Sequence, residues 1–239
     1  MSENNRKLFK TPFSAEYWLL SVKEMKSVQV LVIAAMLTAL RIAIKSAKIP
    51  IGPDLTVTFG FVVNALGSMI YGPVMAAVTS AASDIIGNLL FPSGAFFFPF
   101  TLVEILGGVL FALFYYRAPI TTMRVVWGRF AVTAICNLIL NPICMYYYYM
   151  LLLGKSYTIF SLPRIIKNLA LFPVQSLILV VLFNALLPVT NRLKLTHTGE
   201  VKLQISRREI IAIAGLTIVS ALAVAGYYLY KALTAVPAA

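Results

Sequence analysis

The sequence predicts an all-α membrane protein that crosses the bilayer several times. Of its 239 residues, 60% are hydrophobic and 12% are charged, and the mean hydropathy is +0.88. These values lie far outside the range of soluble globular domains. Several apolar runs approach or exceed the roughly 20 residues that a helix needs to cross a bilayer, whereas barrel strands would alternate over about 10 residues. A helical bundle follows.

The pattern of apolar runs divides the chain into four segments. Residues 1–27 form a basic arm, in which FSAEYWLL predicts an interfacial amphipathic helix with Tyr17 and Trp18 at the headgroup boundary. A membrane domain (28–190), a polar cytoplasmic linker (191–209) and a further apolar helix with a tail (210–239) follow. Within the membrane domain, six spans are expected at about 28–48, 56–71, 73–91, 98–116, 125–153 and 163–188.

The distribution of lysine and arginine sets the expected orientation. If the spans alternate, most of the 20 cations fall on the side of the N-terminus, which predicts a cytoplasmic arm. The outer cations gather in two connections: Arg41, Lys45 and Lys48 in one, Lys155, Arg164 and Lys167 in the other. Snorkelling toward lipid headgroups explains some of this clustering. An anionic ligand on the outer face explains it better.

The stretch DIIGNLLFPSGAFFFPFTLVE, residues 84–104, is the strongest candidate for a binding site. Two apolar runs meet there at a break that contains prolines and a glycine, and each run holds one carboxylate, Asp84 or Glu104. An acidic side chain near the bilayer centre costs roughly 2.5 to 3.5 kcal/mol, so it usually faces protein, a cavity or a ligand. The phenylalanines Phe91, Phe96, Phe97 and Phe98 can stack on a planar ring.

Asp84 and Asn88 lie one turn apart and share a helix face. A carboxylate can accept two parallel hydrogen bonds from an aminopyrimidine-like edge, so Asp84 is a candidate for holding a heterocycle. The alternative is a hydrogen bond between helices inside the bundle. For Glu104 we favour structural pairing.

An acidic ligand group is expected to meet the outer cations. Arg164 is the preferred partner, because it follows Pro163 at the start of the sixth span, where the helix N-terminus also favours anions. Lipid headgroup contact is its alternative. Further polar groups on possible cavity faces are Asn137 and Asn141 in the fifth span and Asn168 and Gln175 in the sixth. Such amides often simply bridge helices.

Several functions have no support in the sequence. There is no GxxxxGK[ST], HExxH or GxSxG motif and no cluster of cysteine and histidine, so ATP hydrolysis, a metal and a cofactor are not expected. The cations lie between apolar spans, which argues against nucleic-acid binding. Two alternatives stay open: an intramembrane enzyme with Asp84 and Glu104 as an acid–base pair, and a structural subunit without a ligand.

Four segments together resemble a known family. They are AAMLTALRIA with its alanine stripe, IPIGPDLTVTFGF, GPVMAAVTSAASDIIGNLLFPSGAFFFPFTLVEILGGVLFALF and PRIIKNLALFPVQ. The chain is similar to the substrate-binding S component of energy-coupling factor (ECF) vitamin transporters, and the folate-specific branch is most similar. Another vitamin or precursor remains an alternative ligand.

The resemblance implies a six-helix bundle in a prokaryotic plasma membrane with a vitamin pocket that opens outward. It implies a subunit without catalytic activity that works with one transmembrane coupling protein and two ATPases, which dock at Ala35 and Ala39. The loaded subunit is expected to tip over in the membrane. For a folate, a pterin would meet Asp84 and the phenylalanines, and a glutamyl dianion would meet arginine and lysine. The seventh helix departs from the six that the family usually has.

Overall fold

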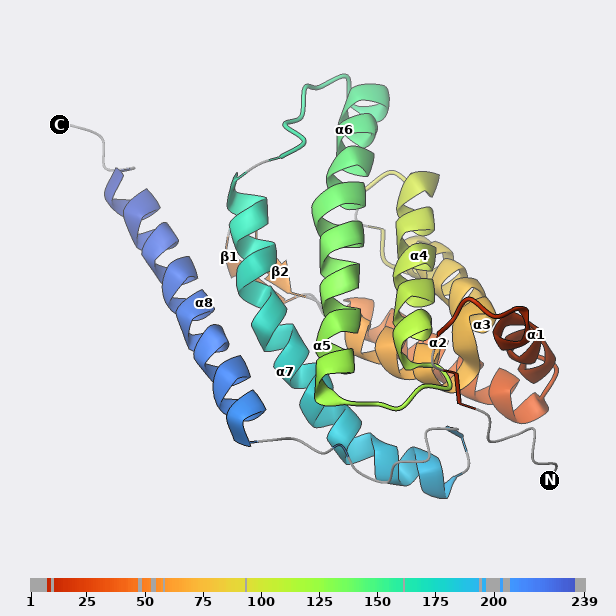
Figure 1. Ribbon diagram of the computed structural model, residues 1–239. Helices are drawn as coiled ribbons and strands as arrows, with labels where there is room; N and C mark the ends of the chain where they lie inside the picture. Colours follow the sequence, from red (N-terminus) through yellow and green to blue (C-terminus); the bar gives the residue numbers. More distant parts are fainter. Residues whose placement is uncertain are drawn as a thin grey trace.

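The computed structural model describes residues 8–9, 11–46, 49–52, 55–57, 59–92, 94–160, 162–193, 195–196, 203 and 207–234. In this part of the chain, helices dominate and form a bundle, with one short hairpin after the second helix (Figure 1). The all-α fold that the composition predicts is confirmed.

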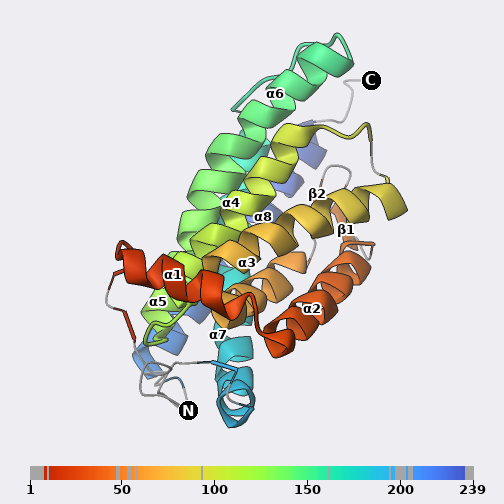
Figure 2. The same cartoon turned by 90° about the vertical axis from the view of Figure 1, so that its right-hand side faces the viewer.

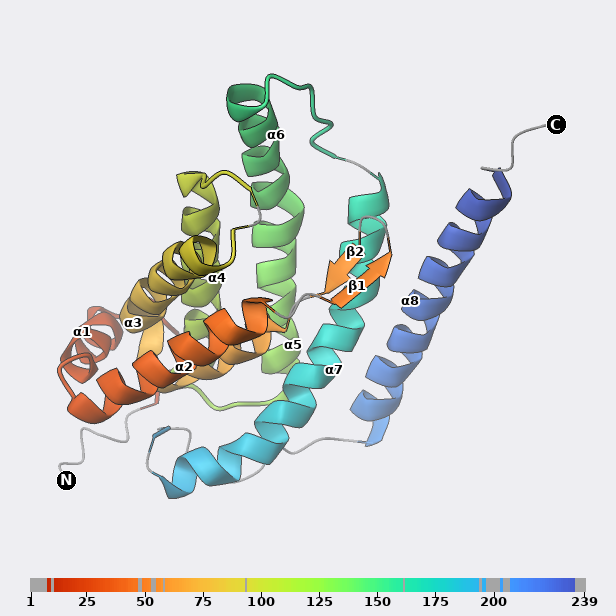
Figure 3. The same ribbon diagram turned by 180° about the vertical axis from the view of Figure 1, so that it is seen from behind.

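The elements follow one another in a simple order. The helices are α1 (Ala15–Glu24), α2 (Val28–Ser46), α3 (Gly60–Leu90), α4 (Phe98–Tyr115), α5 (Thr122–Ala131), α6 (Asn141–Leu152), α7 (Leu162–Arg192) and α8 (Arg207–Thr234). A π-helical segment, η2 (Val132–Leu140), joins α5 to α6 in one long helical rod. Strands β1 (Ile49–Gly52) and β2 (Leu55–Val57) pair antiparallel between α2 and α3 (Figure 3).

Helix α3 contains the second and third predicted spans. Gly72 divides it with a φ of +77°, a conformation that glycine adopts without steric penalty, and Pro73 follows directly. By length and hydropathy, five helices among the described residues can cross a membrane, with α3 counted once. Dividing α3 at its kink recovers the six helices that the sequence predicts.

Two predicted boundaries were wrong. The second span was expected to begin near residue 56, but Thr56 and Val57 belong to β2 and α3 begins at Gly60. The alternating β-branched residues there favour a strand over a helix. The fifth span begins earlier than expected, because Thr121 caps α5 by accepting a hydrogen bond from the Arg124 backbone N–H at 3.3 Å. As a result, Arg124 lies inside α5 and not in the preceding connection.

The additional C-terminal helix is present as α8, which packs against α7 (Figure 1). Its apolar stretch Ile211–Ser220 is shorter than a membrane span within the described residues. Side chains along it, including Ile218 and Leu222, are exposed. That α8 crosses the membrane therefore stays a prediction.

The N-terminal arm holds the expected amphipathic helix, but α1 packs on the bundle. Ser14 caps it, and the Tyr17 hydroxyl donates a hydrogen bond to the carbonyl of Ala112 at 2.9 Å. Ser21 Oγ accepts one from the Val74 N–H at 3.3 Å. Figure 2 shows α1 lying across the end of the bundle beside α3. Tyr17 is buried and not at a headgroup boundary, whereas Trp18 is partly exposed as expected.

The close packing of α3 against α4 positions the two acids of the bundle. The Ser68 hydroxyl donates to the carbonyl of Gly108 at 3.0 Å across this interface, and both residues are buried. Small residues allow such close approach between membrane helices. The two helices thereby bring Asp84, near the end of α3, beside the first turns of α4, where Thr101 and Glu104 lie.

Candidate substrate-binding pocket

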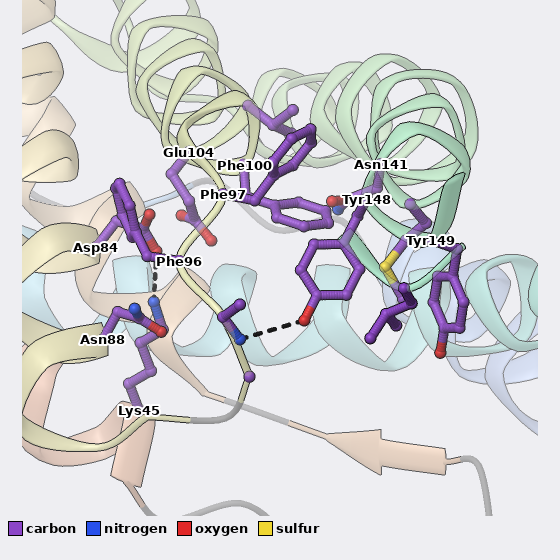
Figure 4. Close-up of a pocket in the computed structure, with 15 residues that line it drawn as sticks. Lys45, Asp84, Asn88, Phe96, Phe97, Phe100, Glu104, Asn141, Tyr148 and Tyr149 are labelled. Atoms are coloured by element: carbon purple, nitrogen blue, oxygen red, sulfur yellow. Dashed lines mark hydrogen bonds and ion pairs between the residues drawn. The ribbon is translucent and has the colours of Figure 1, made fainter. Parts of the chain in front are cut away.

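A cavity of about 470 Å³ opens where the end of α3, the start of α4 and helix α6 converge (Figure 4). This volume suits a small organic molecule. The lining residues come from α2, α3, the connection 91–97, α4, α6 and its C-cap: Lys45, Asp84, Asn88, Gly94, Ala95, Phe96, Phe97, Phe100, Val103, Glu104, Asn141, Met145, Tyr148, Tyr149 and Leu153.

Asp84 is held at one side of this cavity by two donors. Lys45 Nζ lies 2.6 Å from its Oδ1, and the Thr101 hydroxyl donates to its Oδ2 at 2.8 Å. The Asp84 side chain is only 12% exposed. A carboxylate has about four acceptor positions, so each oxygen keeps one for a ligand. The ion pair offsets part of the cost of burying the acid.

Glu104, the second acid of the pocket, forms an ion pair with Arg41. Arg41 Nη1 also donates to Ser80 Oγ at 3.1 Å, so α2 is tied to both α3 and α4. The structural pairing that we favoured for Glu104 is therefore confirmed, although this side chain also lines the cavity. Both acids of the pocket are therefore paired with cations of α2: Glu104 with Arg41, and Asp84 with Lys45.

Aromatic rings form the opposite wall of the pocket. The ring centroid of Phe97 lies 5.7 Å from that of Phe100 and 5.8 Å from that of Tyr148, and Phe100 and Tyr148 are 5.9 Å apart. Figure 4 shows these three rings facing the side that carries Asp84 and Lys45. An ionised acid opposite aromatic rings can bind a planar heterocycle by its polar edge and by its faces.

Tyr148 also fastens the connection between α3 and α4. Its hydroxyl accepts a hydrogen bond from the Ala95 N–H at 3.2 Å, drawn as a dashed line in Figure 4. Gly94 has a φ of +152°, and a Cβ there would lie 2.9 Å from the Tyr148 hydroxyl oxygen. Glycine therefore lets the backbone approach the tyrosine. The contact holds residues 94–97 against the pocket.

Replacing Tyr148 with phenylalanine tests this contact. Since the ring stays and one hydrogen bond of about 1 kcal/mol is lost, we expect a bound ligand to dissociate about fivefold faster. Stopped-flow release of the ligand measures the rate. Tyr147→Phe is the matched control, because Tyr147 is half exposed and does not line the pocket. Equal release rates in the Tyr148 variant and the control would contradict the contact's role.

Arg164 is separated from the cavity wall by the ring of Tyr157. Tyr149, which lines the cavity, stacks on Tyr157 with ring centroids 4.9 Å apart and planes at 24°. The guanidinium carbon of Arg164 lies 5.5 Å from the Tyr157 centroid. Its Nη1 is buried and has no hydrogen-bond partner among the residues that the structure describes. Arg164 is thus close to the site but outside the cavity wall.

The structure brings part of the predicted site together. Five of the predicted residues line the cavity: Lys45, Asp84, Asn88, Phe96 and Phe97. Arg41 reaches it only through Glu104. Phe91 and Phe98 are exposed and do not line it. Lys48 lies outside the described residues.

The predicted residues of α7 do not reach the cavity either. Asn168 donates to the carbonyl of Arg164 in its own helix at 3.0 Å. Gln175 accepts a hydrogen bond from Arg129 Nε at 3.1 Å and so bridges helices, the alternative that the sequence left open. Lys167 is half-buried but does not line the pocket.

Sequence reasoning missed the contribution of α6. Asn141 was noted only as a weak candidate, and Phe100, Met145, Tyr148 and Tyr149 were not considered. The run YYYY at residues 146–149 was the available signal, because four tyrosines cannot all face lipid.

The predicted docking residues Ala35 and Ala39 are both exposed on α2. Ala34, which precedes Ala35 and points to another side of the helix, is buried. The alanine stripe therefore leaves a smooth face open to a partner, which is the arrangement that close helix packing requires.

Comparison with known protein families assigns the fold. The model of the family described as "ECF-type riboflavin transporter, S component" matches residues 25–188. This chain belongs to the S-component family of ECF transporters. The matched region runs from the end of α1 into α7, so α8 of this S component lies beyond it. With its long apolar helices, this S component is a multi-pass membrane protein.

The individual relatives are named for folate, whereas the family description names riboflavin. The chain is 30% identical over 155 residues to the folate transporter FolT of Clostridium novyi, covering 65% of this chain and 88% of the relative. It is 35% identical over 161 residues to FolT of Streptococcus mutans serotype c, covering 62% and 87%. A crystal structure of FolT bound with folic acid matches with a TM-score of 0.55 and 29% identity, covering 63% of this chain and 89% of that one.

Proposed function

We propose that this S component binds a folate in the cavity beside Asp84 and serves as the substrate-binding subunit of a vitamin importer. The observation that carries the proposal is a buried carboxylate with free acceptor positions, facing Phe97, Phe100 and Tyr148. An aminopyrimidine edge offers two parallel donors to such a carboxylate. The pterin ring of a folate has that edge.

The acidic tail of a folate argues for this ligand over riboflavin, which the family description names. Riboflavin also has a planar ring system, but its side chain is a neutral polyol. Arg164 has a buried guanidinium nitrogen that no described residue hydrogen-bonds, so it suits a carboxylate better than a hydroxyl chain. The names of the relatives and the folic acid complex of FolT point to the same substrate.

The proposal includes the partners that transport needs. A transmembrane coupling protein would dock on the exposed face of α2 at Ala35 and Ala39, and two cytoplasmic ATPases would supply the energy. The subunit itself would catalyse no reaction and would deliver its ligand by tipping in a prokaryotic plasma membrane, with the N-terminus in the cytoplasm. The ion pairs of Arg41 and Lys45 tie the docking helix to the pocket, which supports this arrangement.

Calorimetric titration of the purified chain with folic acid and with riboflavin tests the proposal. We expect saturable binding of folic acid without ATP or partners. Arg164→Ala should weaken it about 10- to 100-fold, since a hydrogen bond to a charged group contributes roughly 1.5–3 kcal/mol. Binding of riboflavin but not of folic acid would change the proposed substrate to riboflavin and leave the family assignment unchanged. A chain that binds neither vitamin, nor any other, would be a structural subunit.

A further inference from the structure

We propose that the site accepts folates whose acidic tail is extended by further γ-linked glutamyl residues. Arg164 binds the first glutamyl group, as in folic acid, and Lys155 binds the added carboxylates outside the cavity. The inference rests on the proposed folate specificity and adds a substrate class to it. It predicts that tail length, in addition to the pterin ring, determines affinity.

The cavity itself offers no spare positive charge. Among the described residues that line it, Lys45 is the one cation, and it pairs with Asp84. Arg41, behind the wall, pairs with Glu104. An acidic tail inside the cavity would therefore lie near Asp84 and Glu104, and the cations there already pair with these two acids. The carboxylates of a bound folate are more stable outside the cavity, where cations remain available.

A continuous surface leads out of the cavity to such cations. Tyr149 belongs to the cavity wall, Tyr157 stacks on it at 4.9 Å, and the guanidinium of Arg164 lies over the Tyr157 ring at 5.5 Å. The connection between α6 and α7 and the first turn of α7 supply these groups. A chain that leaves the cavity beside Tyr149 meets the Arg164 guanidinium after passing one ring.

Lys155 stands at the near end of this surface. Gly154 reverses the chain with a φ of +61°, and the Lys155 backbone N–H donates to the carbonyl of Tyr149 at 3.1 Å. The backbone of Lys155 is thus fixed beside a residue of the cavity wall, and its side chain is exposed. Lys155 and Arg164 are thus two cations on the side of the cavity where Tyr149 lies.

Each added γ-linked glutamyl residue brings one more carboxylate along this path. An exposed ion pair increases affinity by roughly a factor of 1.5 to 5 and is weakened by salt. We therefore expect the triglutamyl form of folic acid to bind about 3- to 10-fold more tightly than folic acid at low salt. The advantage should shrink at high salt, because the pairs are at the surface.

The test compares two ligands on the full chain in nanodiscs of neutral lipid. Calorimetry gives the Kd of folic acid and of pteroyltriglutamate for the wild type and for Lys155→Gln, Arg164→Gln and Lys26→Gln. The ratio of the two Kd values is the readout, so a variant that binds both ligands less well is still informative. Lys26 is the matched control, because it is exposed and lies just before α2, at the end of that helix opposite Lys45.

The outcomes separate this inference from the proposed function. A preference for the triglutamate that Lys155→Gln reduces and Lys26→Gln retains, while Arg164→Gln weakens both ligands alike, would support it. Equal or weaker binding of the triglutamate, with folic acid still bound, would overturn the inference alone. A preference that survives Lys155→Gln would overturn the assignment to this residue. Failure of both ligands to bind would overturn the proposed function and the inference with it.

Discussion

Asp84→Asn is expected to weaken folic acid binding about 30- to 150-fold, equivalent to roughly 2–3 kcal/mol. The carboxylate offers two acceptors to the pterin edge, and an asparagine would place an NH₂ group where one acceptor is needed. Lys45 would also lose its ion-pair partner at 2.6 Å. Titration calorimetry of the two chains in the same detergent measures the difference.

Mutating the other acid of the cavity serves as a control, because it distinguishes loss of ligand recognition from loss of negative charge in general. Glu104→Gln removes the same charge, but Glu104 is paired with Arg41, and we expect its effect on affinity to be smaller. A folic acid analogue without the 2-amino group should bind the wild type and Asp84→Asn within a few-fold of each other. If Asp84→Asn binds folic acid like the wild type, the acid does not recognise the pterin and its ion pair is only structural.

Hydropathy and turn residues were sufficient to predict the long helices. They did not predict the short hairpin or the π-helical segment. The long apolar runs placed α2, α4 and α7 within a few residues, and Gly72 and Pro73 correctly divided α3. The hairpin of residues 49–57 was not predicted: the sequence indicated a turn followed by a helix from about residue 56. A short hairpin is stabilised by its pairing, which one strand alone does not reveal. The fusion of α5 and α6 through a π-helical segment has no comparable signature in composition.

For the site, the sequence identified the chemistry better than the geometry. A carboxylate in an apolar run must face something polar, and this argument selected Asp84, which lines the cavity and pairs with Lys45. A helix break has no periodicity, so the sequence could not tell that Phe97 and Phe100 face the cavity while Phe98 is exposed. The tyrosines of α6 fit a headgroup belt equally well, which is why Tyr148 was missed.

Glu24→Gln is expected to lower the free energy of unfolding by about 3 kcal/mol. Arg117 is 2% exposed, and its Nη2 lies 2.5 Å from Glu24 Oε1. The hydroxyl of Tyr116 donates to the other oxygen of Glu24 at 2.7 Å. Burial, with the charge and hydrogen bond of Glu24, raises the pKa of Tyr116, so that the hydroxyl stays a donor. Removing the carboxylate charge takes away the anion that offsets the burial of this guanidinium.

The same cluster fixes α1 to the rest of the bundle, so its loss should be visible locally as well. Burial alone would lower the pKa of Arg117, but the hydrogen bond and charge of Glu24 raise it, which shows how strongly the cation depends on this partner. Equilibrium unfolding in detergent gives the stability, and limited proteolysis reports release of α1. The double variant Glu24→Gln with Arg117→Met should recover part of the loss, since no buried charge remains. Lys23→Gln, on the same helix and exposed, is the control for a surface charge change. A double variant that is destabilised by the sum of its single variants would show that the two side chains are not coupled.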